Sequence, residues 1–231
     1  MREPQPLKPK SKRIETTQAI LIAIFAALIL RQFVIAAYKI PTSSMENTLL
    51  VGDFLLVNKF VYGAKSPDWI GLPFTQETHW KIPTGFEVPK ALQFRLPALT
   101  RPEPYDIVVF QYPRNPRIDF IKRCIAGGGQ TVEIHGKEVR VDGNPFPSPP
   151  FTKYLETARR DSFFSRVVDP GHYFVMGDNR DNSSDSRDWG YVPAENIIGK
   201  PLIVYLSLQE GNAETGIFDR IRWNRLGMVV R

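Results

Sequence analysis

Residues 40–60, IPTSSMENTLLVGDFLLVNKF, are the stretch from which the rest of the chain is interpreted. A serine pair and Met45 lie just beyond the long apolar segment of the N-terminus, and a strand-like apolar run follows, broken at Gly52-Asp53. A serine in this setting is often a turn or cap residue. We interpret Ser44 instead as a nucleophile held near a membrane surface. That hypothesis requires a base, oxyanion donors and a substrate pocket elsewhere in the chain.

The apolar segment before this stretch has the length of a transmembrane helix. Residues 19–38 are predominantly apolar, and about 20 such residues cross the hydrocarbon core. Arg31 lies near one end, where its stem can reach the headgroups. Basic residues are more numerous before the segment than after it, which predicts a cytoplasmic N-terminus and an external remainder. A cleaved signal peptide is the alternative, but the length of the segment favours a retained anchor.

The composition argues against several functional classes. The net charge of +6 is modest, and no basic run with interleaved aromatic residues follows the N-terminal tail, so nucleic acid is not expected as a partner. The single cysteine, Cys124, excludes an intrachain disulfide. The three histidines are dispersed and form no ligand motif, so we expect neither a metal nor another cofactor. The 20 prolines favour turns and β-structure.

The expected organisation is a mainly β protein behind a single transmembrane helix. Its parts are a basic, disordered tail at 1–18, the anchor at 19–38, a catalytic β domain at 39–134 and 172–206, an inserted smaller lobe at 135–171 and a C-terminal tail at 207–231. The C-terminal tail is expected to be a short amphipathic surface helix or disordered. Residues 64–104 are predicted to form an extended loop layer. The predicted strands are 54–60, 106–111, 117–125, 131–134, 138–141, 172–176 and 202–206.

The strongest candidate for the base is Lys122, in RIDFIKRCIAGGG. Alternation along a strand places Lys122 on the same face as Phe120 and Cys124, which is an apolar setting for an ammonium group. Burial lowers the pKa of a lysine, and only a neutral lysine can accept a proton. A lone lysine in a strand is more often a surface residue. No histidine lies in a setting that suggests a Ser-His-Asp triad.

A third stretch, 175–193, reads VMGDNRDNSSDSRDWGYVP and is unusually polar between two apolar flanks. A calcium loop starting at Asp178 fails, because Ser183 stands where glycine is required and Trp189 where the bidentate glutamate is required. The alternation of Asp and Arg indicates instead a polar scaffold paired within itself, with serines free to orient a neighbouring group.

Four segments together resemble the bacterial type I signal peptidases, also called leader peptidases. They are IPTSSMENTLLVGDFLLVNKF, YDIVVFQYP, DFIKRCIAGGG and MGDNRDNSSDSRDWGYVP, in the order and spacing of that family, and the resemblance covers roughly residues 15–206. It implies a membrane-anchored serine endopeptidase with a Ser-Lys dyad, which removes signal peptides from exported preproteins after small residues of the Ala-x-Ala type. It also implies a place on the outer face of the cytoplasmic membrane, with the lipid bilayer as a partner and a functional link to the protein export machinery.

Carried over by position, the resemblance makes Ser44 the nucleophile and Lys122 the general base. It gives the oxyanion hole to the N–H of Ser44 and the hydroxyl of Thr42, and it gives Ser183 a hydrogen bond that aims the amine of Lys122. The residues that would hold this arrangement as structural ion pairs are Asp178, Arg180, Asp185 and Arg187. The residues that would contact the small side chains of the substrate are Ile40, Pro41, Met45, Leu49, Phe120 and Ile121.

The chain departs from the family pattern at three places. Asn47 stands where the family usually has proline, which is expected to loosen the turn after the nucleophile. Tyr105 stands where glycine is common, and residues 126–130 differ from the usual sequence after the lysine. None of these positions supplies a reacting group.

Three other functions share part of this pattern. A self-cleaving repressor-type peptidase shares the Ser-Lys chemistry, but such proteins are soluble and carry a DNA-binding domain. A non-catalytic, membrane-anchored binding or assembly protein with the same fold would need none of Ser44, Lys122 and Ser183. A peptidase dedicated to one substrate stays open from the sequence.

Overall fold

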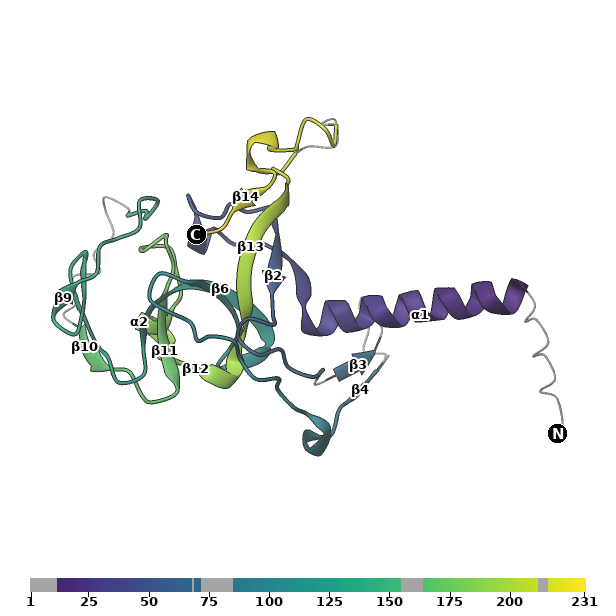
Figure 1. Ribbon diagram of the computed structural model, residues 1–231. Coiled ribbons are helices and arrows are strands. Elements are labelled where there is room, and N and C mark those ends of the chain that lie inside the picture. The colour runs from purple at the N-terminus through teal and green to yellow at the C-terminus, as the bar shows by residue number, and fades with distance from the viewer. Residues whose placement is uncertain (1–11, 68, 72–84, 155–163, 212–215) are drawn as a thin grey trace.

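The structure is a computed structural model that describes residues 12–67, 69–71, 85–154, 164–211 and 216–231. One long helix, α1 (Lys12–Phe33), precedes a body built largely of β-strands. The expectation of a mainly β fold behind an N-terminal apolar helix is therefore confirmed. In Figure 1, α1 projects from one side of the body, and the C-terminus lies on the body itself.

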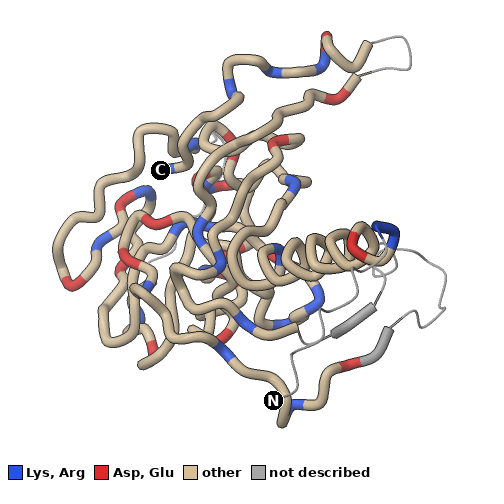
Figure 2. The backbone as a smooth tube through the Cα atoms, turned by 45° about the vertical axis from the view of Figure 1, so that its right-hand side comes forward, with Lys and Arg blue, Asp and Glu red and all other residues tan. Residues whose placement is uncertain are grey.

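Helix α1 begins and ends earlier than the predicted anchor at 19–38. Residues 12–18, assigned to a disordered tail, are helical, and Thr16 and Thr17 donate to the carbonyls four residues before them at 2.9 Å. Mean hydropathy reaches 1.7, enough for a membrane span, and no residue of α1 is buried in the body. Basic positions colour the end of α1 that lies away from the body (Figure 2), where the helix begins with Lys12 and Arg13.

The prediction that the helix continues to residue 38 is wrong. Residues Ile35–Lys39 form strand β1, which pairs antiparallel with β2 (Asp53–Asn58) so that Ile35 lies opposite Asn58. The side chains of this segment alternate between exposed and half-buried, as in a strand with one face against the body. Pairing with β2 supplies the backbone hydrogen bonds that a helix would otherwise have supplied.

The main sheet runs in the order β1-β2-β13-β5-β6-β11-β12, and β14 pairs with β13. All of these pairings are antiparallel. The bounds of the other strands are β5 (Ile107–Tyr112), β6 (Asn115–Gly127), β11 (His172–Met176), β12 (Val192–Pro193), β13 (Ile197–Ser207) and β14 (Met228–Val229). Strand β11 has the predicted bounds, whereas β6 and β13 are longer than predicted.

A second sheet, in the order β10-β7-β8-β9, forms the smaller lobe seen at the left of Figure 1. Its strands are β7 (Thr131–His135), β8 (Glu138–Val141), β9 (Asn144–Pro145) and β10 (Phe164–Val167). It begins at Thr131, before the predicted boundary at 135, because β7 pairs with β8 and β10 and with no strand of the main sheet. Apolar side chains such as Val132 and Phe146 pack against Phe174 of β11 and join this lobe to the body.

The predicted loop layer, 64–104, contains some regular structure. A short hairpin of β3 (Trp69–Gly71) and β4 (Gly85–Glu87) and a 3₁₀ turn at Lys90–Leu92 lie within it, whereas residues 72–84 lie outside the described residues. Arg95 ties the loop to the body, because its guanidinium donates to the carbonyls of Gly63, Tyr62, Ala194 and Ile197.

The C-terminal segment is neither a surface helix nor disordered over its described residues, so this prediction is wrong. Strand β14 pairs with β13, and Val230 is buried in the core. Arg225 binds the buried carboxylate of Asp53 at 2.6 Å and the carbonyl of Thr48 at 3.0 Å. Arg225, one of the basic residues that suggested a surface helix, thus holds the turn after Ser44.

Tyr105, where the resemblance leads one to expect glycine, has a left-handed backbone with φ of 75°. This conformation costs a residue with a Cβ about 1–2 kcal/mol. Its ring stacks on Phe146 of the smaller lobe at 4.1 Å between centroids, and its carbonyl accepts from Arg123 at 2.7 Å. The lobe contact offsets the strain.

We expect Tyr105→Ala to be less stable than Tyr105→Gly. Both variants lose the stack on Phe146, but only glycine adopts the positive φ without a steric penalty, so the difference in unfolding free energy should be about 1 kcal/mol. Urea unfolding in detergent measures both values. Equal stabilities, or a more stable alanine variant, would show that Tyr105 is not strained.

Candidate active site

Ser44 lies in a short 3₁₀ turn, Ser43–Met45, between β1 and β2. The turn is fixed because Met45 and Leu49 are fully buried and because Thr48 and Leu49 donate to the carbonyl of Met45. Asn47 has a φ of 76°, which asparagine tolerates and proline cannot adopt. The departure at Asn47 therefore changes the shape of this turn rather than loosening it.

The structure brings Ser44 and Lys122 together, as predicted. Lys122 Nζ lies 2.6 Å from Ser44 Oγ and donates to the carbonyl of Ile121 at 3.0 Å. Both side chains are buried, and the ammonium also lies 5.4 Å from the centre of the Phe120 ring. Burial lowers the pKa of Lys122 from 10.5 to about 8, although Asp185 and Asp178 act in the opposite direction. A substantial fraction of this lysine is therefore neutral near pH 8.

Two candidate oxyanion donors lie beside the dyad. Within the described residues, no backbone carbonyl accepts from the N–H of Ser44. Thr42 precedes the turn in an extended conformation, and its side chain is exposed and makes no capping hydrogen bond. The oxyanion hole formed by these two donors stays a prediction.

The polar scaffold is paired differently from the prediction. Asp178 accepts from Nε and Nη2 of Arg123 at 2.8 and 2.7 Å and from Thr48 at 2.6 Å. Its oxygens are thus occupied by residues outside the segment 175–193, so Asp178 does not belong to a scaffold paired within itself. The buried guanidinium of Arg180 donates to the hydroxyl of Tyr154 at 3.4 Å and lies over the Tyr154 ring.

Asp185 and Arg187 form an ion pair within the segment. Two nitrogens of the guanidinium lie 2.8 Å from the two carboxylate oxygens. Burial acts to raise the pKa of Asp185, but the hydrogen bonds and charge of Arg187 outweigh it, and the pKa lies below its ordinary value. Asp185 also caps the helix α2 (Ser186–Trp189), which fixes its orientation.

Ser183 does not make the expected hydrogen bond to Lys122. The amine of Lys122 is directed instead at Ser44 Oγ and the Ile121 carbonyl. Ser183 packs on Gly177, where a Cβ would lie 2.3 Å from its hydroxyl and 2.5 Å from the carbonyl of Ser44. Only glycine allows this close approach.

Several residues that hold the nucleophile turn were not predicted. Asn179 donates its N–H to the carbonyl of Ser44 at 3.0 Å and its side chain to the carbonyl of Ser43 at 3.1 Å. Lys153 binds Glu46 at 2.9 Å. Arg123, which binds Asp178, is the one such residue whose position the sequence indicated. Adjacent residues of a strand point to opposite faces, so a strand that directs Lys122 to one face directs Arg123 to the other.

The residues expected to contact substrate lie in two apolar clusters, except for Pro41. Ile40, Met45 and Leu49 belong to one buried cluster, against which Ile121 packs. Phe120 packs in another cluster, beside Tyr112, and Pro41 is exposed. Within the described residues, no group of three His, Cys, Asp or Glu side chains could hold a metal ion.

Comparisons with known proteins agree with the sequence resemblance. The family model described as signal peptidase, peptidase S26, matches residues 13–206. The chain is 34% identical to signal peptidase I of Aquifex aeolicus, over 81% of this chain and 82% of that protein. It is 31% identical to signal peptidase I of Pseudomonas aeruginosa, over 84% and 72%. A crystal structure of a signal peptidase I from Enterococcus faecalis is 29% identical, with a TM-score of 0.39 over 44% of this chain and 97% of that one.

The lowered pKa of Lys122 predicts the pH dependence of any reaction in which it accepts a proton. Because the lysine must be neutral, kcat/KM should rise about tenfold per pH unit below about 8 and level off above it. The profile is measured with a substrate that has no ionisable group near the cut. A flat profile between pH 6 and 9 would contradict this assignment.

Proposed function

The chain belongs to the peptidase S26 family of signal peptidases, and from this premise we propose that Ser44 and Lys122 are the dyad with which it cleaves signal peptides from preproteins. The contact of 2.6 Å between Lys122 Nζ and Ser44 Oγ carries the proposal. It joins a weak nucleophile to a base whose pKa is lowered by burial, and the pairing activates a serine without histidine.

The geometry gives each group a role in the reaction. Neutral Lys122 accepts the proton of Ser44 as Oγ attacks the scissile carbonyl carbon. The resulting oxyanion accepts from the N–H of Ser44 and the hydroxyl of Thr42, and such a donor contributes about 3 kcal/mol in comparable enzymes. The ammonium of Lys122 then protonates the leaving amine. Water, activated by the same lysine, hydrolyses the acyl-enzyme and restores Ser44.

The substrate peptide would lie between two strand edges that no strand of the described residues pairs with. Strand β1 is the last strand of the main sheet, and β11 pairs only with the end of β6 after Lys122, which leaves the edge of 117–122 open. Four antiparallel pairings separate β1 from β6, so the two strands run in the same direction. An extended peptide can pair with both edges and reach Ser44.

We expect the surface beside the dyad to favour small side chains. Ile40, Met45 and Leu49 pack in their own buried cluster, so little of their surface is left open to a substrate side chain. Alanine fits such a surface, whereas a larger side chain meets packed atoms. This supports cleavage after residues of the Ala-x-Ala type.

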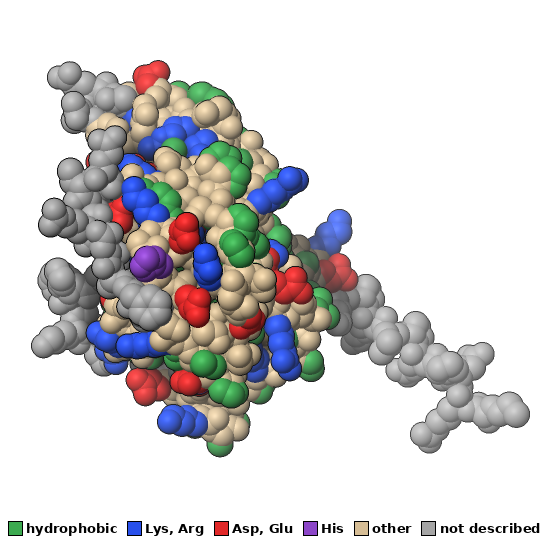
Figure 3. Space-filling view, turned by 90° about the vertical axis from the view of Figure 1, so that its left-hand side faces the viewer, with side chains coloured by type: hydrophobic (Ala, Val, Ile, Leu, Met, Phe, Trp, Pro, Cys, Tyr) green, Lys and Arg blue, Asp and Glu red, His purple; other side chains and the backbone are tan. Residues whose placement is uncertain are grey.

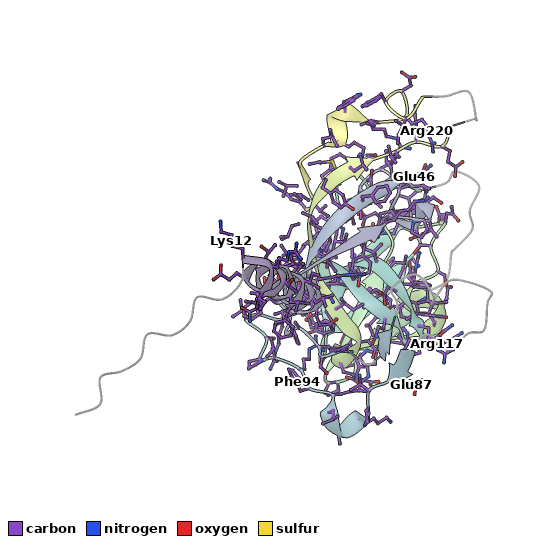
Figure 4. The ribbon with its side chains drawn as sticks, turned by 90° about the vertical axis from the view of Figure 1, so that its right-hand side faces the viewer. Lys12, Glu46, Glu87, Phe94, Arg117 and Arg220 are labelled. Atoms are coloured by element: carbon purple, nitrogen blue, oxygen red, sulfur yellow. The ribbon has the colours of Figure 1, made fainter. Side chains whose placement is uncertain are left out.

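The body is proposed to rest on the lipid surface that α1 crosses. Phe94 is exposed and stacks on Phe33 at the end of α1, at 6.0 Å between centroids. On the other side of α1, Phe218 and Trp223 are 72% and 60% exposed in the C-terminal loop. Figure 4 looks along α1 and shows Phe94 and Arg220 on either side of it. The opposite face, in Figure 3, intersperses acidic and basic side chains as a solvated surface does.

We place the body on the outer side of the cytoplasmic membrane, with the face that carries Phe94, Phe218 and Trp223 against the lipid and the N-terminus in the cytoplasm. The basic residues at the start of α1 support this orientation. Signal peptides of exported preproteins emerge on the outer side, which implies the functional link to the protein export machinery. Strand β1 alone separates α1 from the catalytic turn, so Ser44 lies eleven residues past Phe33, the last residue of α1.

The non-catalytic alternative has no observation in its favour, because a binding protein has no use for a buried lysine in contact with a serine. Whether the enzyme serves many preproteins or one is decided by comparing cleavage of several unrelated preproteins.

Ser44→Ala and Lys122→Ala should each lower cleavage of an Ala-x-Ala preprotein by about 10³-fold or more, because each removes one member of a unit that acts together. Ser43→Ala is the matched control. It removes the neighbouring hydroxyl, which contacts Asn182 at 3.0 Å, and should keep most activity. Activity retained in Lys122→Ala would exclude this lysine as the base. Loss of activity in Ser43→Ala but not in Ser44→Ala would mean that Ser43 is the nucleophile.

Single-cysteine labelling tests the orientation. Cys124 is buried, and burial raises the pKa of its thiol to about 12, so background labelling should be low. In intact spheroplasts, a membrane-impermeant maleimide should label Arg140→Cys, whereas Lys12→Cys should react only after lysis. The reverse pattern would place the catalytic domain in the cytoplasm.

A further inference from the structure

We propose that a second site, separate from the dyad of Ser44 and Lys122, binds the phosphate group of a glycerophosphate, whether this group belongs to a membrane lipid or to a soluble ester. The site is a pocket of about 750 Å³, a volume typical of pockets that bind small molecules. The proposal goes beyond peptide cleavage and does not rest on the roles of Ser44 and Lys122.

The pocket lies where three strands of the main sheet end or begin. Its walls include Gly127 at the end of β6, Tyr173 near the start of β11 and Ile197 at the start of β13. Residues of the loop 95–102 supply a further wall. Lys122 lies five residues before Gly127 in β6, which is about 17 Å along the strand. The pocket is therefore distinct from the place where a peptide would meet the dyad.

Two arginines give the pocket a positive charge. Arg95 is half-buried, and its guanidinium donates to four backbone carbonyls, whereas Arg101 is exposed. Over the described residues, neither arginine forms an ion pair with a carboxylate. Burial lowers the pKa of Arg95, and the charge of Glu195, an acidic residue of the pocket, acts in the opposite direction. The described residues of the pocket thus carry a net positive charge, which favours an anion.

The two guanidinium groups act on the same part of the pocket wall. Burial raises the pKa of the Tyr173 phenol, and the charges of Arg101 and Arg95 both act to lower it. The two arginines therefore lie on one side of the pocket, close to the ring of a residue that is only 8% exposed. Guanidinium groups bind phosphate oxygens through paired N–H donors. A phosphate group beside Tyr173 can meet the charge of both.

The departure from the family pattern at 126–130 lies in this pocket. Gly127 and Gly128 line the pocket and present no side chain to it. A Cβ on Gly128 would lie 2.8 Å from the carbonyl oxygen of Asp169, so only glycine fits there. A Cβ on Gly127 would lie 3.7 Å from the ring of Tyr173, which is an ordinary contact. A long side chain at this position would therefore cover Tyr173, whereas glycine leaves room for a ligand.

The loop that supplies one wall of the pocket also contacts the membrane anchor. Phe94 stacks on Phe33 at the end of α1, and Arg95 is the next residue. Strands β3 and β4, which precede it in the same loop, lie beneath the end of α1 in Figure 1. A lipid headgroup at the end of α1 is thus close to this loop, and basic pockets at a membrane surface recognise anionic headgroups. The position favours a lipid as the source of the phosphate.

The test measures binding of two probes to the full chain in detergent. Glycerol 3-phosphate is titrated by calorimetry, and phosphatidylglycerol is compared with phosphatidylcholine, which has no net charge, by native mass spectrometry. Wild type should bind at least one of the two phosphate probes. Arg101→Ala should weaken this binding about tenfold or more, because it removes a charged donor. Gly127→Leu should abolish it by filling the space beside Tyr173, whereas Gly127→Ala adds one methyl group and should retain it.

Arg140→Ala is the matched control, because it also removes one exposed positive charge but lies in the smaller lobe, and it should bind as wild type does. Loss of glycerol 3-phosphate in the pocket variants would identify a soluble ester, and loss of phosphatidylglycerol alone would identify a lipid. Arg101→Ala changes only an exposed side chain, so it decides the test if Gly127→Leu does not fold. Absence of binding of either probe to wild type would overturn the proposal. So would an equal loss in Arg140→Ala and Arg101→Ala.

Discussion

The site depends on the burial of one ammonium group against one hydroxyl. Lys122 is 4% exposed and its nitrogen lies 2.6 Å from Ser44 Oγ. Burial of a lysine is unfavourable while it is charged, and this cost lowers its pKa towards the working range of a base. The acidic residues Asp178 and Asp185 oppose the shift, but each is neutralised by its own arginine. The scaffold can therefore lie near the lysine without keeping it protonated.

The surrounding structure holds these two atoms together across a large sequence separation. Ser44 is fixed by a turn whose neighbours bind the body: Thr48 donates to Asp178, Asn179 donates to the carbonyl of Ser44, and Arg225 binds Asp53 and the carbonyl of Thr48. Lys122 is fixed by its place in β6. Preorganisation of this kind avoids reorganisation during the reaction, because donors and base are positioned before substrate arrives.

The sequence predicted the parts of the protein whose signal is local. Alternation and turn residues predicted β8 and β11 with their bounds, and the apolar setting predicted a buried Lys122. The break between α1 and β1 was missed, because residues 34–38 are as apolar as the helix and only pairing with β2 makes them a strand. The pair Asp178–Arg123 and the role of Arg225 were missed for the same reason, since both join segments far apart in the chain. The Asp/Arg alternation of 178–187 suggested pairing within the segment, which holds for Asp185 with Arg187 but not for Arg180.

The most direct test of this account is the pKa of Lys122 itself, measured by NMR titration of the folded protein in detergent with labelled lysine side chains. The resonance is assigned by its absence in Lys122→Met. The account predicts a midpoint near 8, because burial outweighs the nearby carboxylates. A midpoint near the ordinary value of 10.5 would mean that the lysine is charged at working pH and cannot be the base that activates Ser44.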